Sequence, residues 1–76
     1  MLQDLDRVAL TRDIPEHDLV SGDLGAIVHI YADGKAYEVE FVGLAGETIA
    51  IVTLPAEAVR AVAKGEIANA RMIAAA

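Results

Sequence analysis

An Asp-Gly pair, Asp33-Gly34, stands between two β-rich runs at residues 26–31 and 36–41. This is the arrangement of a β-hairpin, because a type I′ turn needs a positive φ at both central residues and Asp-Gly tolerates it. A two-residue loop makes one face of the hairpin apolar, with Ile30 opposite Tyr37, Val28 opposite Val39 and Ala26 opposite Phe41. The other face then pairs Tyr31 with Ala36, His29 with Glu38 and Ile27 with Glu40. Such a face suits solvent.

The size and composition of the chain limit what it can bury. At 76 residues we expect one domain with a small core. Two tyrosines and one phenylalanine are the only aromatic residues, so the core must consist mainly of aliphatic side chains. The absence of cysteine excludes disulfides and thiolate metal sites.

The charge and hydropathy of the chain limit the classes of partner and the cell compartment that we expect. Twelve acidic residues against six basic ones give a net charge of −6, which repels phosphate backbones, so we expect no nucleic-acid partner. No stretch approaches the about 18 apolar residues that cross a bilayer, and the acidic start lacks an apolar run of signal-peptide length. We therefore expect a cytoplasmic protein that does not bind membranes.

The segments before the hairpin predict a strand and a long loop. Residues 6–11 alternate weakly and favour a short strand. Residues 12–21 form a charged loop, in which the apolar Ile14, Leu19 and Val20 are expected to be buried anchors. The following Gly22-Asp23-Leu24-Gly25 resembles a phosphate loop only superficially, because no lysine lies in it and no helix follows. We interpret its glycines as residues that supply a positive φ at a turn and a bend where the strand begins.

Residues 48–54 predict a further strand, whose register depends on the preceding loop. A four-residue loop would place Ile49 and Ile51 beside Glu40 and Glu38, whereas a five-residue loop places them beside Phe41 and Val39. We favour the five-residue loop, because it puts both isoleucines on the apolar face. Four apolar residues then remain on the outer face: Ile27, Val42, Ala50 and Val52.

The C-terminal part has two interpretations. Residues 55–65 fit either a turn followed by a final strand, or a helix that begins at Pro55 and ends before Gly65. Residues 66–76 have high helix propensity but are too few to form a helix alone. We divide the chain into a β domain at residues 1–63 and an alanine-rich extension at 64–76, for which a helix packed on the domain and a frayed end both stay open.

A first strand, a long charged loop, a Gly-Asp-x-Gly segment before a strand, a tight hairpin and a further strand form a layout that resembles small SH3-like barrels. The most specific segments are Asp13-Ile14-Pro15-Glu16 and Ala36-Tyr37-Glu38-Val39-Glu40-Phe41, and with them the chain is similar, over residues 4–62, to members of the domain of unknown function family 4926. Further matching segments are Val8-Ala9-Leu10, Leu19, Gly22-Asp23-Leu24-Gly25, Val28-His29-Ile30-Tyr31, Gly34, Gly46-Glu47-Thr48 and Val59-Arg60. After Val59-Arg60 the family pattern leads us to expect proline, and Ala61 in its place permits a helical last element.

The resemblance implies a mostly β fold: a small, partly open SH3-like barrel of four to five antiparallel strands with a short C-terminal helix. It also implies a bacterial protein without established activity, found beside toxin-like genes, and hence an antitoxin or immunity role. In SH3-like barrels the first long loop lies over the binding face, so we expect the acidic loop and nearby aromatic edges to bind a basic protein. The expected partner-binding residues are Asp13, Glu16, His17, Asp18, Tyr31 and Tyr37.

Enzymatic and metal-dependent functions have little support in the sequence. His29 and Glu38 could form a proton-transfer pair, but a surface cross-strand pair explains them without a nucleophile or third partner. The loop carboxylates with His17 match neither an EF-hand nor a paired-histidine zinc site. We expect no catalytic residues, no metal and no cofactor.

Two functions of different classes stay open. The first is a non-enzymatic protein-binding module that uses the acidic loop. The second is an accessory subunit or self-assembling structural domain, including a homo-oligomer, that uses the outer apolar β face.

Overall fold

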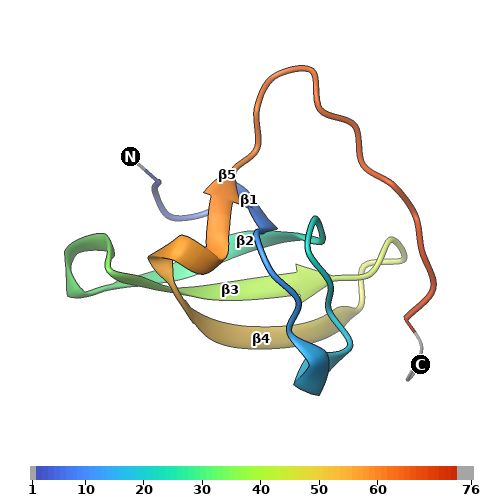
Figure 1. Ribbon diagram of the computed structural model, residues 1–76, viewed down its shortest axis with the longest axis horizontal. Helices are drawn as coiled ribbons and strands as arrows, with labels where there is room; N and C mark the ends of the chain where they lie inside the picture. Colours follow the sequence, from blue (N-terminus) through green and yellow to red (C-terminus); the bar gives the residue numbers. More distant parts are fainter. Residues whose placement is uncertain (1, 74–76) are drawn as a thin grey trace.

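Five antiparallel strands form one sheet in the order β4-β3-β2-β1-β5 in the computed structural model, which describes residues 2–73 (Figure 1). The strands are β1 (Arg7–Leu10), β2 (Leu24–Tyr31), β3 (Ala36–Val42), β4 (Thr48–Pro55) and β5 (Val59–Ala61). Three single 3₁₀ turns lie between them: η1 (Pro15–His17), η2 (Ala32–Gly34) and η3 (Ala56–Ala58). The prediction of a mostly β domain of antiparallel strands is confirmed.

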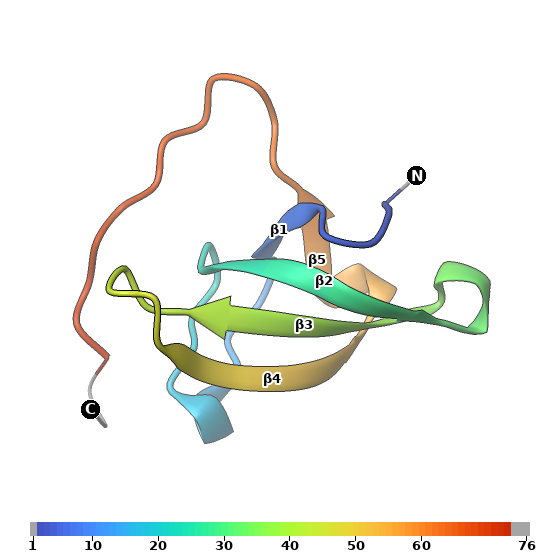
Figure 2. The same ribbon diagram turned by 180° about the vertical axis from the view of Figure 1, so that it is seen from behind.

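The core lies on the concave side of this sheet. The short strands β1 and β5 turn across the direction of the long strands β2, β3 and β4, so that the sheet curls over one set of side chains (Figures 1 and 2). The buried set is aliphatic apart from two aromatic rings, as the composition predicted: Val8, Leu10, Ile14, Leu19, Ile27, Tyr37, Val39, Phe41, Leu54, Ala58 and Val59.

The Asp-Gly turn joins β2 and β3 as predicted. Asp33 and Gly34 have φ values of 57° and 92°, and the Lys35 amide donates to the Ala32 carbonyl at 3.3 Å. The nearest pairs also follow the prediction: Tyr31 with Ala36, Ile30 with Tyr37, and His29 with Glu38. This end of the hairpin could be read from the residues because the turn fixes its register.

Beyond His29 the predicted register is wrong, because a β-bulge inserts Val28 as an extra residue in β2. Ile27 lies opposite Val39 and Ala26 opposite Glu40, instead of the expected Val28–Val39, Ala26–Phe41 and Ile27–Glu40 pairs. The bulge turns Ile27 into the core, where it is 0% exposed, and leaves Val28 36% exposed on the outside. It thereby buries the larger of the two side chains.

The same shift turns Gly25 toward the core at a close approach. A Cβ atom there would lie 2.5 Å from Val39 Cγ1 and 3.0 Å from Phe41 Cε1. Any side chain would therefore push β2 away from these core residues. A glycine at this point lets the sheet curl tightly.

The pairing of β3 with β4 also differs from the prediction. Five residues, 43–47, separate Val42 from Thr48 as favoured, but a second irregularity follows, so that Phe41 lies opposite Ala50. Ile51 consequently lies opposite Glu40 and is 53% exposed, not beside Val39 as expected.

Three other predictions for the outer face are wrong, two because of this irregularity and one because of the bulge at Val28. Ala50 and Val52, expected outside, pack partly buried against the core, and Ile27 is a core residue. Val42 is 53% exposed, as expected for the outer face.

The last strand decides between the two C-terminal interpretations. Val59 and Ala61 pair with Leu10 and Val8, so residues 59–61 form strand β5 and a helix over residues 55–65 is wrong. The gain is the burial of Val59, which is 6% exposed. In the described part of the chain no helix is long and apolar enough to cross a bilayer.

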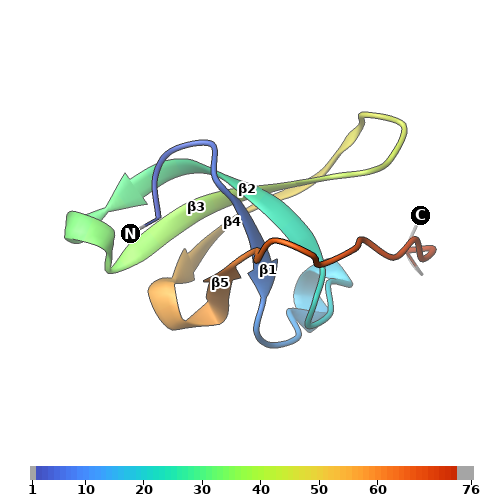
Figure 3. The ribbon, with the colours of Figure 1, turned by 90° about the horizontal axis from the view of Figure 1, so that it is seen from above.

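Residues 62–73, here called the tail, contain no helix or strand (Figure 3). The helical interpretation of residues 64–76 is therefore wrong for 64–73, and residues 74–76 lie outside the described residues. The physical reason is that a short segment keeps a helix only when an apolar face packs on something, and Ile67 and Met72 are 91% and 84% exposed.

The bulge gives a direct test by paired substitutions. Ile27→Ala should lower the free energy of unfolding by about 3 kcal/mol, because it empties core volume, whereas Val28→Ala should cost about 0.5 kcal/mol. Urea denaturation followed by circular dichroism measures both. Equal losses, or a larger loss for Val28→Ala, would show that β2 carries no bulge.

Candidate protein-binding site

The loop between β1 and β2 is held rigidly at its base. Ile14 and Leu19 form an isolated bridge, with the Ile14 amide donating to the Leu19 carbonyl at 2.8 Å. Both side chains are buried, at 6% and 3% exposure, so these two predicted anchors are confirmed. Val20, the third, is 39% exposed and is not an anchor.

The bridge projects an acidic tip, which we define as Asp13, Glu16, His17 and Asp18. Glu16 and His17 lie exposed on η1. Asp18 has a left-handed backbone with φ 57°, and its amide donates to the Pro15 carbonyl at 3.1 Å. One oxygen of Asp13 accepts the Ser21 amide hydrogen at 2.9 Å, so this residue closes the loop as well as adding charge. The four residues thus share one loop, as predicted.

The two predicted tyrosines do not join the acidic tip. Tyr37 is 6% exposed among the core residues, so it offers no aromatic edge to a partner. Tyr31 is 37% exposed at the η2 end of the hairpin, and Figures 1 and 3 both show this end away from η1. Across the hairpin Tyr31 pairs with Ala36, the neighbour of Tyr37, and side chains alternate between the two faces along a strand. The two tyrosines therefore lie on opposite faces of the sheet.

Tyr31 belongs to a separate cluster on the outer face. Its ring meets that of His29 edge to face, with the ring centroids 4.3 Å apart. Its hydroxyl donates to Glu38 Oε1 at 3.3 Å. The predicted cross-strand pair of His29 and Glu38 is confirmed in register, and Tyr31 supplies the hydrogen bond to the carboxylate.

The described residues hold no group of three or more His, Cys, Asp or Glu side chains that could bind a metal ion. The carboxylates of the acidic tip do not form such a group, and that of Asp13 is turned toward the Ser21 amide. The chemistry of the acidic tip is therefore that of a surface with negative charge, suited to cationic side chains.

Two residues that sequence reasoning missed meet beside the acidic tip. Arg71 of the tail donates from Nε to Asp23 Oδ1 at 2.9 Å and from Nη2 to Asp23 Oδ2, and Nη2 also donates to the Asp18 carbonyl at 3.0 Å. We call the three acceptor atoms, both Asp23 carboxylate oxygens and the Asp18 carbonyl oxygen, the notch. The one hint in the sequence was a lone arginine within an alanine-rich segment.

The charge of Asp23 is stabilised in this arrangement. Partial burial by itself would raise the pKa of its carboxyl, but hydrogen bonds from Arg71 and from the Val20 amide, together with the positive charge of Arg71, outweigh it and lower the pKa below 3.8. A carboxyl whose pKa is lower in the folded state stabilises that state above its unfolded pKa, and the contribution is lost as the pH falls through the folded pKa.

A second ion pair fixes the start of the tail. Arg60 donates from Nη1 and Nη2 to the two carboxylate oxygens of Glu66 at 2.9 and 2.7 Å. Glu66 also accepts the Ala63 amide hydrogen at 2.6 Å. The hydrogen bonds from Arg60 and Ala63 lower the pKa of Glu66 to about 2. The tail therefore leaves β5 through a defined turn.

A small all-β domain with a rigid, acidic first loop is what these observations define. Residues 4–61 match the family model described as domain of unknown function (DUF4926), and the chain belongs to this family. No curated protein and no solved structure matches the chain in the corresponding comparisons.

The Asp23 titration can be measured residue by residue. We expect the Asp23 carboxyl to titrate below 3.8 in the wild type and its pKa to rise in Arg71→Ala, while the Val20 amide keeps part of the shift. Carboxyl carbon shifts in an NMR pH titration report this directly. Glu66 is the internal control, because Arg60 holds its pKa at about 2 in both proteins. An unchanged Asp23 pKa in Arg71→Ala would contradict the contact.

Proposed function

We propose that this protein is an SH3-like, non-enzymatic protein-binding module that binds a basic protein segment through its acidic tip. The strand order β4-β3-β2-β1-β5, with a long loop between the first two strands, supports the SH3-like assignment. An antitoxin or immunity-type role fits this module, because such proteins neutralise a partner by covering its surface.

The observation that carries the proposal is the display, on one hydrogen-bonded loop, of carboxylates that form no ion pair within the described residues. Within the described residues the ion pairs are Arg60 with Glu66 and Arg71 with Asp23, so the carboxylates of Glu16 and Asp18 have no cationic partner within ion-pair distance. The Ile14–Leu19 bridge fixes the backbone beneath them. A partner therefore meets these charges with little loop ordering to be lost on binding.

The charge of the whole chain acts in the same direction. With a net charge of −6, the protein attracts a basic partner over a distance of about one Debye length, roughly 10 Å at 0.1 M salt. The acidic tip then orients the complex. Binding of this kind is fast at low salt and weakens as salt is added.

Charge substitution in the acidic tip tests the proposal. We expect Glu16→Lys with Asp18→Asn to reduce capture of a basic partner from the native cell at least tenfold at low salt. Asparagine is used at residue 18 because it tolerates the left-handed backbone. Pull-down followed by mass spectrometry and quantitative binding of the identified partner gives the readout.

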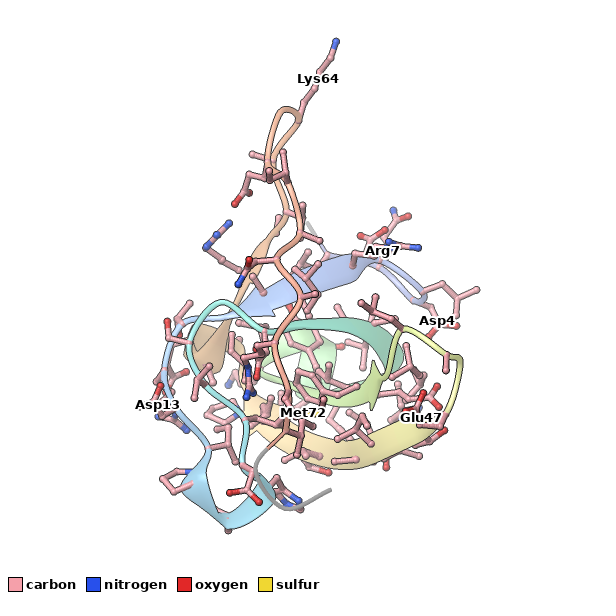
Figure 4. All side chains as sticks on the ribbon, turned by 90° about the vertical axis from the view of Figure 1, so that its right-hand side faces the viewer. Asp4, Arg7, Asp13, Glu47, Lys64 and Met72 are labelled. Atoms are coloured by element: carbon pink, nitrogen blue, oxygen red, sulfur yellow. The ribbon has the colours of Figure 1, made fainter. Side chains whose placement is uncertain are left out.

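The matched control is Glu47→Lys with Asp33→Asn, which changes the net charge equally and also places asparagine at a φ of 57°. Figure 4 shows Asp13 and Glu47 on opposite sides of the molecule, so the control leaves the acidic tip intact. Equal loss in both double variants would mean that only net charge matters. No loss in either would remove the acidic tip as the binding surface.

A second candidate function is self-assembly through the outer face of the sheet. The observation that favours it is a set of three exposed apolar residues on neighbouring strands, here called the strip: Val42 and Ile51 are both 53% exposed and Val28 is 36% exposed. The strip includes Ile51 of β4, an edge strand whose outer hydrogen-bonding groups are open to a further strand. A second copy could cover both.

Solution mass tests self-assembly. If the strip is an interface, the wild type should have a mass that is a multiple of 8.0 kDa, and Ile51→Lys should return it to 8.0 kDa. Ile67→Lys, the same change at a 91% exposed residue of the tail, should leave the mass unchanged. Sedimentation equilibrium gives the answer, and a wild type that stays monomeric at high concentration excludes this function.

A further inference from the structure

The notch beside the acidic tip already contains a guanidinium group. Arg71 is bound through both oxygens of Asp23 and through the Asp18 carbonyl, and its side chain and that of Asp23 are 31% and 19% exposed. This is the fork geometry with which arginine, and not lysine, binds a carboxylate. The contact is thus specific for one type of side chain.

The notch is built by the β domain and does not depend on the tail. Asp23 Oδ2 accepts the Val20 amide hydrogen at 2.8 Å, and the Asp23 carbonyl accepts the Leu10 amide hydrogen at 2.9 Å. The Asp18 backbone is held by the hydrogen bond that its amide donates to the Pro15 carbonyl. The acceptor atoms of the notch therefore stay in place when Arg71 leaves.

The tail, in contrast, has little else to hold it. It forms an arch that leaves β5, runs clear of the sheet and returns beside the first loop, with Lys64 pointing outward at its tip (Figures 1 and 4). Residues 63–70 are exposed throughout. The Arg60–Glu66 pair anchors its start and Arg71 anchors its far end.

From these observations we infer that the notch is an arginine-binding site that the tail fills in cis, so that Arg71 competes with an arginine of the basic partner. The inference rests on the proposed function, because it names the side chain that the partner presents. The inference adds that, in the free protein, Arg71 occupies the notch that the arginine of the partner would bind.

The competition sets a threshold for binding. A short tether gives Arg71 an effective concentration on the order of millimolar at the notch. A ligand with a single arginine binds too weakly to displace it. A basic segment that also contacts Glu16 and Asp18 gains enough affinity to do so. The tail therefore weakens the binding of isolated arginines and favours multivalent basic segments.

The test uses the full chain and a five-residue peptide with one central arginine, together with its lysine counterpart. We expect Arg71→Ala to bind the arginine peptide about fivefold to tenfold more tightly than the wild type, with little gain for the lysine peptide. Lys64→Ala is the matched control, because it removes the same charge from the tail without touching the notch. Adding Asp23→Asn to Arg71→Ala should abolish the gain.

NMR on the same samples locates the effect. In the wild type the Arg71 side-chain Nε–H signal and the amides of residues 70–72 should be ordered at all protein concentrations, and those amides should become mobile in Arg71→Ala. Equal peptide affinity of the wild type and Arg71→Ala, equal binding of the two peptides, or a mobile wild-type tail would each overturn the inference. An Arg71 signal and a solution mass that change together with concentration would place Arg71 in a second copy, and would also overturn it.

The outcome separates this inference from the proposed function. If Arg71→Ala gains no affinity while Glu16→Lys with Asp18→Asn still loses the partner, the acidic tip binds the partner and the tail does not compete with it. If Arg71→Ala gains affinity for the arginine peptide while the tip variant keeps its partner, the arginine site stands and the proposed function falls.

Discussion

The bulge at Val28 determines which residues of the first half of β2 face the core. It turns Ile27 inward beside Val39, brings Gly25 against the core and lets the sheet curl until β1 can pair with both β2 and β5. A chain with three aromatic residues needs this curvature, because a flat sheet of aliphatic side chains would bury too little apolar surface. The loop that carries the acidic tip hangs between β1 and β2, so its position follows from the same bend.

The elements fixed by local chemistry could be predicted from the sequence. Asp33-Gly34 determined its own turn and the three pairs next to it, and the apolar Ile14 and Leu19 identified the base of the first loop. The two irregularities could not be predicted, because an extra residue in a strand is decided by which side chain fits the core best. One such residue reverses the faces of its strand. For this reason Val52 lies opposite Val39, where Ile51 was expected.

Much the same division applies to the candidate site. The residues of the acidic tip are neighbours in sequence, so their proximity was predictable, whereas Tyr37 depended on the core and Arg71 on a contact between residues 48 positions apart. Long-range contacts from a segment without periodicity leave no pattern in the sequence. Only the folded backbone brings Asp23, Asp18 and Arg71 together.

The tail also separates two properties that most domains couple. The buried core ends at Val59 and the family match at residue 61, while Arg71 lies beyond both. Within the described chain, substitutions after residue 61 therefore leave the hydrophobic core unchanged. A single substitution in the tail can then change the occupancy of the notch, and it removes the Asp23–Arg71 ion pair without altering the packed core. Selection can act on the two properties independently.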